Sequence, residues 1–140
     1  PGRQARHPGS GHRTGGGFST PPWVAPRPYP GEKRQAFFEA EKEKFDFIGD
    51  VRMYGLDGGI DIIDPATGQG DTNATVKLMY RIFELGAIII SLRGNILRFQ
   101  PPLVITEAQL DQAFTMIDQA FSELAAGKLT LPAKAAEMGW

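Results

Sequence analysis

Apolar residues recur at helical spacing in three stretches of this 140-residue chain. In 32–45, Phe38 and Phe45 lie seven positions apart in a largely charged segment, which predicts a short amphipathic helix with one aromatic stripe. Residues 71–86 have polar capping candidates at their start and Gly86 at their end, which predicts a second helix. Both helices are expected to pack one face against the rest of the domain.

The third helix has the clearest start signal. Thr106 and Gln109 form a T-x-x-Q capping box, in which each side chain binds a backbone amide that the first turn leaves free. Ile105 and Leu110 flank the box as a hydrophobic staple, and Gly127 marks the end of the helix. The apolar face between these limits consists of Leu110, Ala113, Phe114, Ile117, Ala120, Phe121 and Leu124.

Segments rich in β-branched and aliphatic residues predict the strands. Residues 48–64 are broken by Gly55, Gly58 and Gly59, so they are expected to form two short strands, or one strand with a bulge, before the turn "DPATGQG". The continuously apolar run "AIIIS", 87–91, predicts a buried strand. A turn at 93–95 leads into a strand at 96–99, which stops before two consecutive prolines because proline cannot donate to a ladder.

This order of elements predicts an α+β fold, with a small, mostly antiparallel sheet and helices packed on one side. The predicted domain spans 31–127 and is followed by a C-terminal tail, 128–140. Residues 1–30 hold four arginines, seven prolines, six glycines and no acidic residue. Such a segment buries too little apolar surface to offset its ordering entropy, so we expect it to be disordered.

Charge and composition narrow the classes of function. The formal net charge is −1, and removing the +4 of residues 1–30 leaves −5 for the rest, which favours neither nucleic acid nor an anionic membrane as a partner. The absence of cysteine excludes disulfides and thiolate metal sites. No apolar run is long enough to span a bilayer, and no secretion signal is recognisable. We therefore expect a soluble, cytoplasmic protein.

Arg98 is the residue that most invites a functional interpretation, because it interrupts the apolar strand "ILRF". Strand alternation places Ile96 and Arg98 on one face and Leu97 and Phe99 on the other. Arg98 could be an edge-strand arginine that reaches solvent or pairs with a nearby carboxylate. Alternatively, its planar guanidinium could grip a substrate carboxylate through two parallel hydrogen bonds. Spacing alone leaves both interpretations open.

Other candidate sites have less support. His7 and His12 lie in the N-terminal segment without accompanying acidic residues, so no metal site is predicted. The glycines at 15–17 follow no strand and precede no helix, which argues against a phosphate-binding loop. No Ser/His/Asp or Cys/His arrangement for nucleophilic catalysis can be assembled.

Three quoted stretches resemble a known family in order and spacing. They are "IGDVRMYGLDGGIDIIDPATGQ", "GAIIIS" and "GNILRFQPPLVITEAQLD", and together they resemble the C-terminal small domain of class III pyridoxal-phosphate aminotransferases. This family includes the ornithine, acetylornithine, 4-aminobutyrate and diamine transaminases. The resemblance covers residues 32–126, and "LRFQPPLVI" is most similar to the ornithine and diamine branches.

The resemblance implies roles for the residues around Arg98. Arg98 matches the family arginine that binds the carboxylate of the amino-acid donor or of the 2-oxo-acid acceptor. Gly94 and Asn95 are implied to shape a loop at the substrate mouth, and the two prolines fix the exit from the strand. One departure is Asp57, where relatives usually carry an apolar residue, so the packing of that strand is expected to differ.

The family's cofactor machinery has no counterpart in this sequence. In these enzymes a lysine of the large domain forms a Schiff base with pyridoxal 5'-phosphate, and an aspartate pairs with the pyridinium nitrogen. Neither motif is found, so we expect the complete enzyme to use the cofactor and this chain alone neither to bind it nor to turn over. A separate large-domain chain or a homodimer is the expected partner. Residues 1–30 would then be remnants of the large domain, an out-of-frame product or a native tail.

Three functions follow from these observations. The first is a part of a transaminase that moves an amino group from an (ω-)amino acid or diamine to a 2-oxo acid. The second is a non-catalytic module that holds a carboxylate at Arg98. The third is a nonfunctional fragment whose exposed apolar face promotes association.

Overall fold

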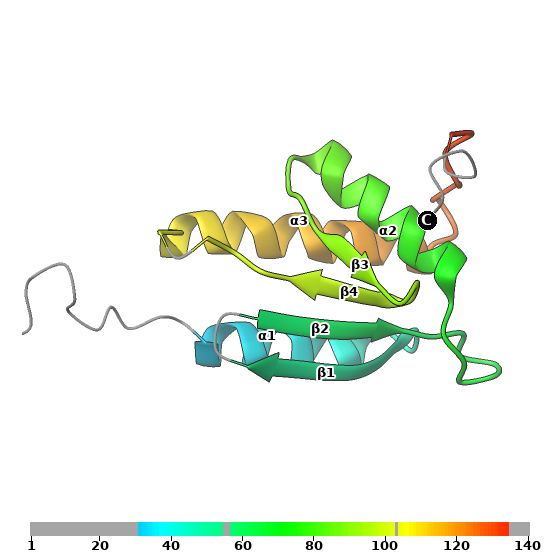
Figure 1. Cartoon of the computed structure of the whole chain (residues 1–140), viewed down its shortest axis with the longest axis horizontal. Coiled ribbons are helices and arrows are strands. Elements are labelled where there is room, and N and C mark those ends of the chain that lie inside the picture. The colour runs from blue at the N-terminus through cyan, green and yellow to red at the C-terminus, as the bar shows by residue number, and fades with distance from the viewer. Residues whose placement is uncertain (1–30, 55–56, 103, 135–140) are drawn as a thin grey trace, which may run out of the picture.

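A computed structural model describes residues 31–54, 57–102 and 104–134 (Figure 1). It contains one four-stranded sheet and three helices, which confirms the predicted α+β fold. In chain order the elements are α1 (Gly31–Lys44), β1 (Ile48–Tyr54), β2 (Asp57–Ile62), α2 (Thr72–Leu85), β3 (Ile90–Leu92), β4 (Ile96–Phe99) and α3 (Glu107–Ala125). The predictions made for residues 1–30 lie outside the described residues.

The strands are arranged in the order β1-β2-β4-β3, and every neighbouring pair is antiparallel. Strand β4 is therefore an inner strand, paired with β2 on one side and with β3 on the other. At its centre, Arg98 lies opposite Gly59 of β2 and Ile90 of β3. The predicted alternation is confirmed, because Leu97 and Phe99 are buried.

The helices cover the face of the sheet that carries these buried side chains. Figure 1 shows α1 and α3 behind the strands, and α2 packs against α3 and β3. Aromatic rings fill much of this layer: the ring centroids of Phe38 and Phe99 lie 5.5 Å apart, and those of Phe37 and Phe114 lie 4.1 Å apart. Aromatic pairs at such distances add to the stabilisation that burial gives. The opposite face of the sheet carries no helix among the described residues, and Arg98 lies there.

The predicted helix ends are confirmed. The Asp71 carboxylate accepts a hydrogen bond from the Ala74 amide at 3.0 Å, and Gly86 ends α2 with a left-handed φ of 110°, a conformation that favours glycine. The Thr106 hydroxyl accepts from the Gln109 amide at 3.1 Å, while the Gln109 side chain accepts from the Thr106 amide at 3.0 Å. This is the predicted capping box at the start of α3.

The prediction of a buried strand at 87–91 is wrong. Strand β3 begins only at Ile90, and the order of the sheet makes it an edge strand. Ile89 is buried, whereas Ile88 is 82% exposed and Ile90 43% exposed. A continuously apolar run predicts cover on both faces. Here the helices cover one face only, so Ile88 and Ile90 are exposed to solvent.

Candidate carboxylate-binding site

Arg98 lies above a glycine floor on the open face of the sheet. Gly59 is its cross-strand neighbour, and a side-chain carbon placed on Gly59 would meet only the Ile96 side chain, at 3.5 Å. An open depression of about 330 Å³ results. It is lined by Arg52, Tyr54, Asp57, Gly58, Gly59, Leu92, Ile96 and Arg98. The missing side chain at Gly59 thus leaves room beside the guanidinium.

Within this depression Arg98 is paired with Asp57, the first residue of β2. Its Nε donates to one carboxylate oxygen at 2.9 Å and its Nη2 to the other at 2.8 Å. The hydrogen bonds from Arg98 lower the pKa of Asp57, and the Asp57 carboxylate raises the pKa of Arg98. Both groups therefore remain charged near neutral pH. The pairing of Arg98 with a nearby carboxylate is confirmed, whereas its expected place on an edge strand is wrong, because β4 lies between β2 and β3.

The pairing with Asp57 uses only one edge of the guanidinium. A planar guanidinium offers two forks, one through Nε and Nη2 and one through Nη1 and Nη2. Asp57 takes the first fork, and no described residue bonds to Nη1 of Arg98. The Arg98 side chain is 30% exposed, so solvent reaches it. The second fork, through Nη1 and Nη2, can therefore bind another carboxylate while Asp57 stays in place.

A second arginine lies on the same face. Arg52 of β1 is the cross-strand neighbour of Gly59 on the other side, so Gly59 separates the two arginines. Its Nη2 bonds to Asp61 at 2.7 Å, and its Nη1 lies 3.8 Å from Asp50. Both terminal nitrogens of Arg52 thus have an acidic neighbour, unlike those of Arg98. The sequence analysis did not single out Arg52. Strand alternation would have placed it on the open face, because its neighbour Val51 is apolar and buried.

Gly94 and Asn95 lie at the opposite end of β4, in the turn from β3. Asn95 accepts a hydrogen bond from the Ile62 amide at 2.8 Å through its carbonyl and donates one to the Ile62 carbonyl at 3.4 Å through its side chain. A side-chain carbon on Gly70 would lie 2.6 Å from the Asn95 side chain. These contacts brace the turn against the end of β2. Neither Gly94 nor Asn95 lines the depression beside Arg98.

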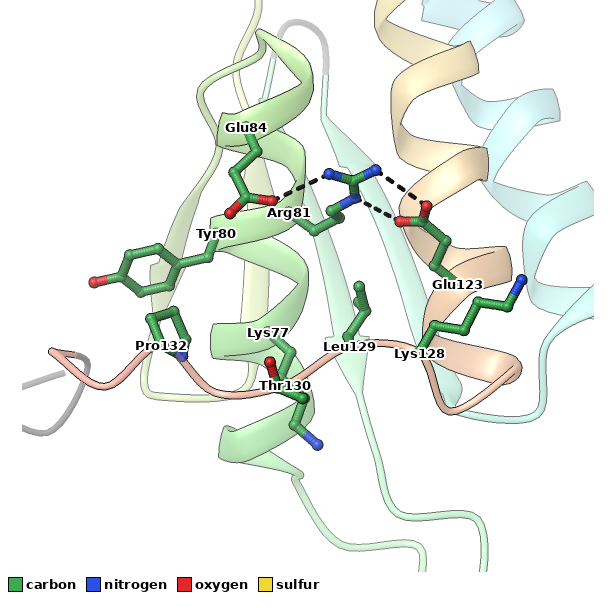
Figure 2. Close-up of a pocket in the computed structure, with 9 residues that line it drawn as sticks. All are labelled: Lys77, Tyr80, Arg81, Glu84, Glu123, Lys128, Leu129, Thr130 and Pro132. Carbon is green, nitrogen blue, oxygen red and sulfur yellow. Dashed lines mark hydrogen bonds and ion pairs between the residues drawn. The ribbon is translucent and has the colours of Figure 1, made fainter.

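Another depression lies between α2 and the end of α3 and measures about 310 Å³ (Figure 2). At its centre Arg81 binds Glu123 side-on, with Nε and Nη2 at 2.5 and 3.1 Å from the two oxygens. Its Nη1 binds Glu84 at 3.1 Å. Arg81 is therefore occupied at both edges and joins two helices. Lys77 and Lys128 also line this depression.

Neither of these two depressions combines a lysine with the surroundings that a phosphate group needs. The depression beside Arg98 contains no lysine that could form a Schiff base. The depression of Figure 2 contains two lysines, but its two glutamates oppose a phosphate group. In the described part of the chain, no three His, Cys, Asp or Glu side chains gather into a metal site. None of the helices among the described residues has the length and apolar character needed to cross a bilayer.

Comparison with known proteins identifies the class. The family described as "Aminotransferase class-III" matches residues 31–121, so the chain belongs to the class III aminotransferase family. The predicted resemblance is confirmed, and complete members of this family use pyridoxal phosphate.

Two curated relatives and one solved structure illustrate the match. The isoleucine 2-epimerase of Lentilactobacillus buchneri is 47% identical over 76% of this chain and 24% of its own length. The leucine/methionine racemase of Thermococcus litoralis is 36% identical over 71% of this chain and 23% of its own length. The crystal structure of acetylornithine aminotransferase from Elizabethkingia anophelis has a TM-score of 0.58 and 34% identity over 66% of this chain and 23% of that one. The chain therefore spans about a quarter of the length of these relatives.

Proposed function

We propose that this chain is the carboxylate-binding domain of a pyridoxal-phosphate enzyme that acts on a free amino acid, with Arg98 as the residue that binds the α-carboxylate. The observation that carries the proposal is the fork through Nη1 and Nη2 of Arg98 beside the glycine floor, where no described residue bonds to Nη1. A carboxylate matches this fork in shape and charge. Gly94 and Asn95 would act indirectly in this proposal, by fixing the turn from which β4 starts.

The cofactor and the lysine that binds it would come from a large domain outside these 140 residues, on the same chain or on a partner chain, including the second subunit of a homodimer. The exposed Ile88 and Ile90 support such a partner, because they extend the apolar part of the open face. In the complete enzyme, the family reaction transfers an amino group from an amino acid or a diamine to a 2-oxo acid. The chain alone would be inactive.

Epimerisation of a neutral amino acid is a second candidate reaction. The favouring observation is the 47% identity to an isoleucine 2-epimerase, against 34% to the acetylornithine aminotransferase structure. Both reactions need the α-carboxylate of the substrate to be held, so Arg98 would have the same role in each. They differ in whether a 2-oxo acid is consumed.

A domain exchange tests the proposal. Residues 31–127 of this chain would replace the corresponding part of the Lentilactobacillus buchneri epimerase, and isoleucine turnover would be measured with and without a 2-oxo acid. We expect Arg98→Lys to raise KM at least tenfold, since an ammonium cannot make two parallel bonds. Arg81→Lys, outside the depression beside Arg98, is the matched control and should leave KM unchanged. Equal effects of the two substitutions would contradict the proposal.

The non-catalytic alternatives make different predictions for the chain alone. A module that only holds a carboxylate would bind 2-oxoglutarate through Arg98 yet give an inactive exchange protein. A nonfunctional fragment would associate in solution through its apolar face. Sedimentation of the purified chain distinguishes these, because the fragment alternative requires aggregates or dimers at micromolar concentration. A borohydride-sensitive absorption band in the chain alone would contradict the need for a large domain.

A further inference from the structure

We infer that Asp57 is the positioning residue of the carboxylate site: by binding one edge of the Arg98 guanidinium, it fixes the orientation in which the other edge receives the substrate carboxylate. This inference rests on the proposed function of Arg98. It assigns a role to the residue at which the sequence departs from the family pattern, where relatives usually carry an apolar side chain. The departure thus has a structural consequence at the site itself.

The geometry favours orientation by Asp57 over simple neutralisation. An arginine side chain has several rotatable bonds, and ordering it opposes binding unless a partner has already fixed it. Asp57 supplies two hydrogen bonds, of 2.9 and 2.8 Å, to Nε and Nη2, which fix both the position and the plane of the guanidinium. A single hydrogen bond would leave the plane free to rotate. Asp57 itself is held as the first residue of β2, opposite Tyr54 of β1.

The negative charge of Asp57 also opposes a second carboxylate at the same arginine. This repulsion is screened, because the side chains of Arg98 and Asp57 are 30% and 45% exposed to solvent. The substrate carboxylate would moreover approach Nη1, on the far side of the guanidinium from Asp57. Orientation is therefore the larger effect. Substitution of Asp57 by a residue that cannot hold the guanidinium should weaken carboxylate binding, although it removes a negative charge.

Arg52 and Asp61 provide the matched control on the same face. Asp61 bonds to Arg52 through one nitrogen, at 2.7 Å, so it does not fix the guanidinium plane in the way Asp57 does. Asp61→Asn removes the same charge from β2, and Asp61 lies two positions from Gly59, as Asp57 does on the other side. It should therefore report any general effect of lost negative charge on this face. The depression beside Arg98 does not include Asp61 among its lining residues.

The test is an acetate titration of the whole chain, followed by the backbone amide signals of β4 in every variant and by the Arg98 Nε–Hε signal where Arg98 is present, with acetamide as the uncharged control ligand. We expect Asp57→Ala and the isosteric Asp57→Asn to weaken acetate binding on the order of fivefold and to move or broaden the Arg98 signal before any ligand is added. Asp61→Asn should change neither. The thermal midpoint of each variant shows whether it is folded.

The outcomes separate this inference from the proposed function. Loss of acetate binding in Arg98→Lys together with unchanged binding in both Asp57 variants would overturn the inference and leave the proposed function standing. Tighter acetate binding in the Asp57 variants would also overturn it, because Asp57 would then be a competitor for Arg98. Acetate binding that is unaffected by Arg98→Lys would overturn the proposed function itself.

Discussion

Arg98 and Arg81 make the same side-on pair with a carboxylate, yet they differ at the other edge of the guanidinium. Arg81 is closed at both edges, because Glu123 takes Nε and Nη2 while Glu84 takes Nη1. Arg98 has Asp57 on one edge, and no described residue bonds to its Nη1. Their surroundings also differ: Arg81 joins α2 to α3, whereas Arg98 lies beside Gly59 on the open sheet face. An ion pair alone therefore does not separate a structural arginine from a binding one. We propose that the edge to which no described residue bonds makes this difference.

The largest effect is expected from a substitution on the buried face of β4, opposite the face that carries Arg98. Leu97→Ala removes a side chain that is 0% exposed, and it should lower the free energy of unfolding by about 3 kcal/mol through lost burial and the cavity left behind. Carboxylate binding by the molecules that remain folded should not change, because Leu97 points away from Arg98. Urea unfolding and acetate titration measure the two quantities. A loss of binding in folded Leu97→Ala would show that strand packing, rather than the fork, determines binding.

Lysine substitutions at the two arginines should have opposite effects. Arg98→Lys is expected to weaken acetate binding at least tenfold and to leave the thermal midpoint almost unchanged, since the pair with Asp57 is solvent-exposed. Arg81→Lys should lower the thermal midpoint by several degrees, because a lysine cannot hold Glu123 and Glu84 together, and should leave acetate binding at Arg98 unchanged. Calorimetry and the titration are performed on both variants. An equal fall of the thermal midpoint in both variants would contradict the distinction between Arg98 as a binding arginine and Arg81 as a structural one.

The pH dependence of stability should come from Glu41, a carboxylate whose charge is poorly satisfied. Burial, followed by the charge of Asp118, raises the pKa of Glu41 to about 7 in the folded chain, against an ordinary value of 4.5. Lys44 lies 3.7 Å away and also binds Asp118. The folded state then binds more protons than the unfolded state between these pKa values, so stability should fall as the pH rises from about 4.5 to 7.

Glu41→Gln removes this titration and should flatten the profile. Because solvent screens the exposed Lys44 and Asp118, we expect a gain of only about 1 kcal/mol at pH 8 over the original chain. The pairs of Asp57 and Glu123 titrate in the other direction. Their arginine partners lower both pKa values, so their stabilisation is lost only when the pH falls below the ordinary carboxyl range. A profile that remains sloped between pH 5 and 7 in Glu41→Gln would contradict this assignment.

The smallest effect is expected from a substitution that makes Arg81 resemble Arg98. Glu84→Ala frees Nη1 of Arg81 while Glu123 keeps its side-on pair. If a free end on a fixed fork is sufficient to bind a carboxylate, the Arg81 Nε–Hε signal should begin to respond to acetate, with roughly a two- to threefold gain in affinity at that site. An Arg81 signal that stays unresponsive would show that the glycine floor beside Arg98 is also required.

Sequence reasoning found the elements whose signals are local. The capping box at Thr106, the cap at Gly86 and the alternation that turns Arg98 away from Leu97 each depend on residues a few positions apart. The structure confirms all three. The order of helices and strands, and with it the α+β fold, follows from the same local patterns.

The site itself depends on contacts that no local pattern encodes. Asp57 and Arg98 are 41 positions apart, and they meet only because β2 pairs with β4 in one register. Sequence alone marked Asp57 as unusual for the family but gave no partner for it. The misjudged run at 87–91 has the same cause, because strand order decides whether an apolar strand is central or at an edge. Gly94 and Asn95 were expected at the substrate mouth, a role that stays a prediction.

The most direct test of the account follows the Nε–Hε signals of Arg98 and Arg81 in one sample of the unmodified chain during a titration with acetate. We predict a saturable shift of the Arg98 signal, no shift of the Arg81 signal, and no response of either signal to acetamide. Equal shifts of both signals, or an Arg98 signal that does not move, would contradict the claim that the open edge of Arg98 is a carboxylate-binding site.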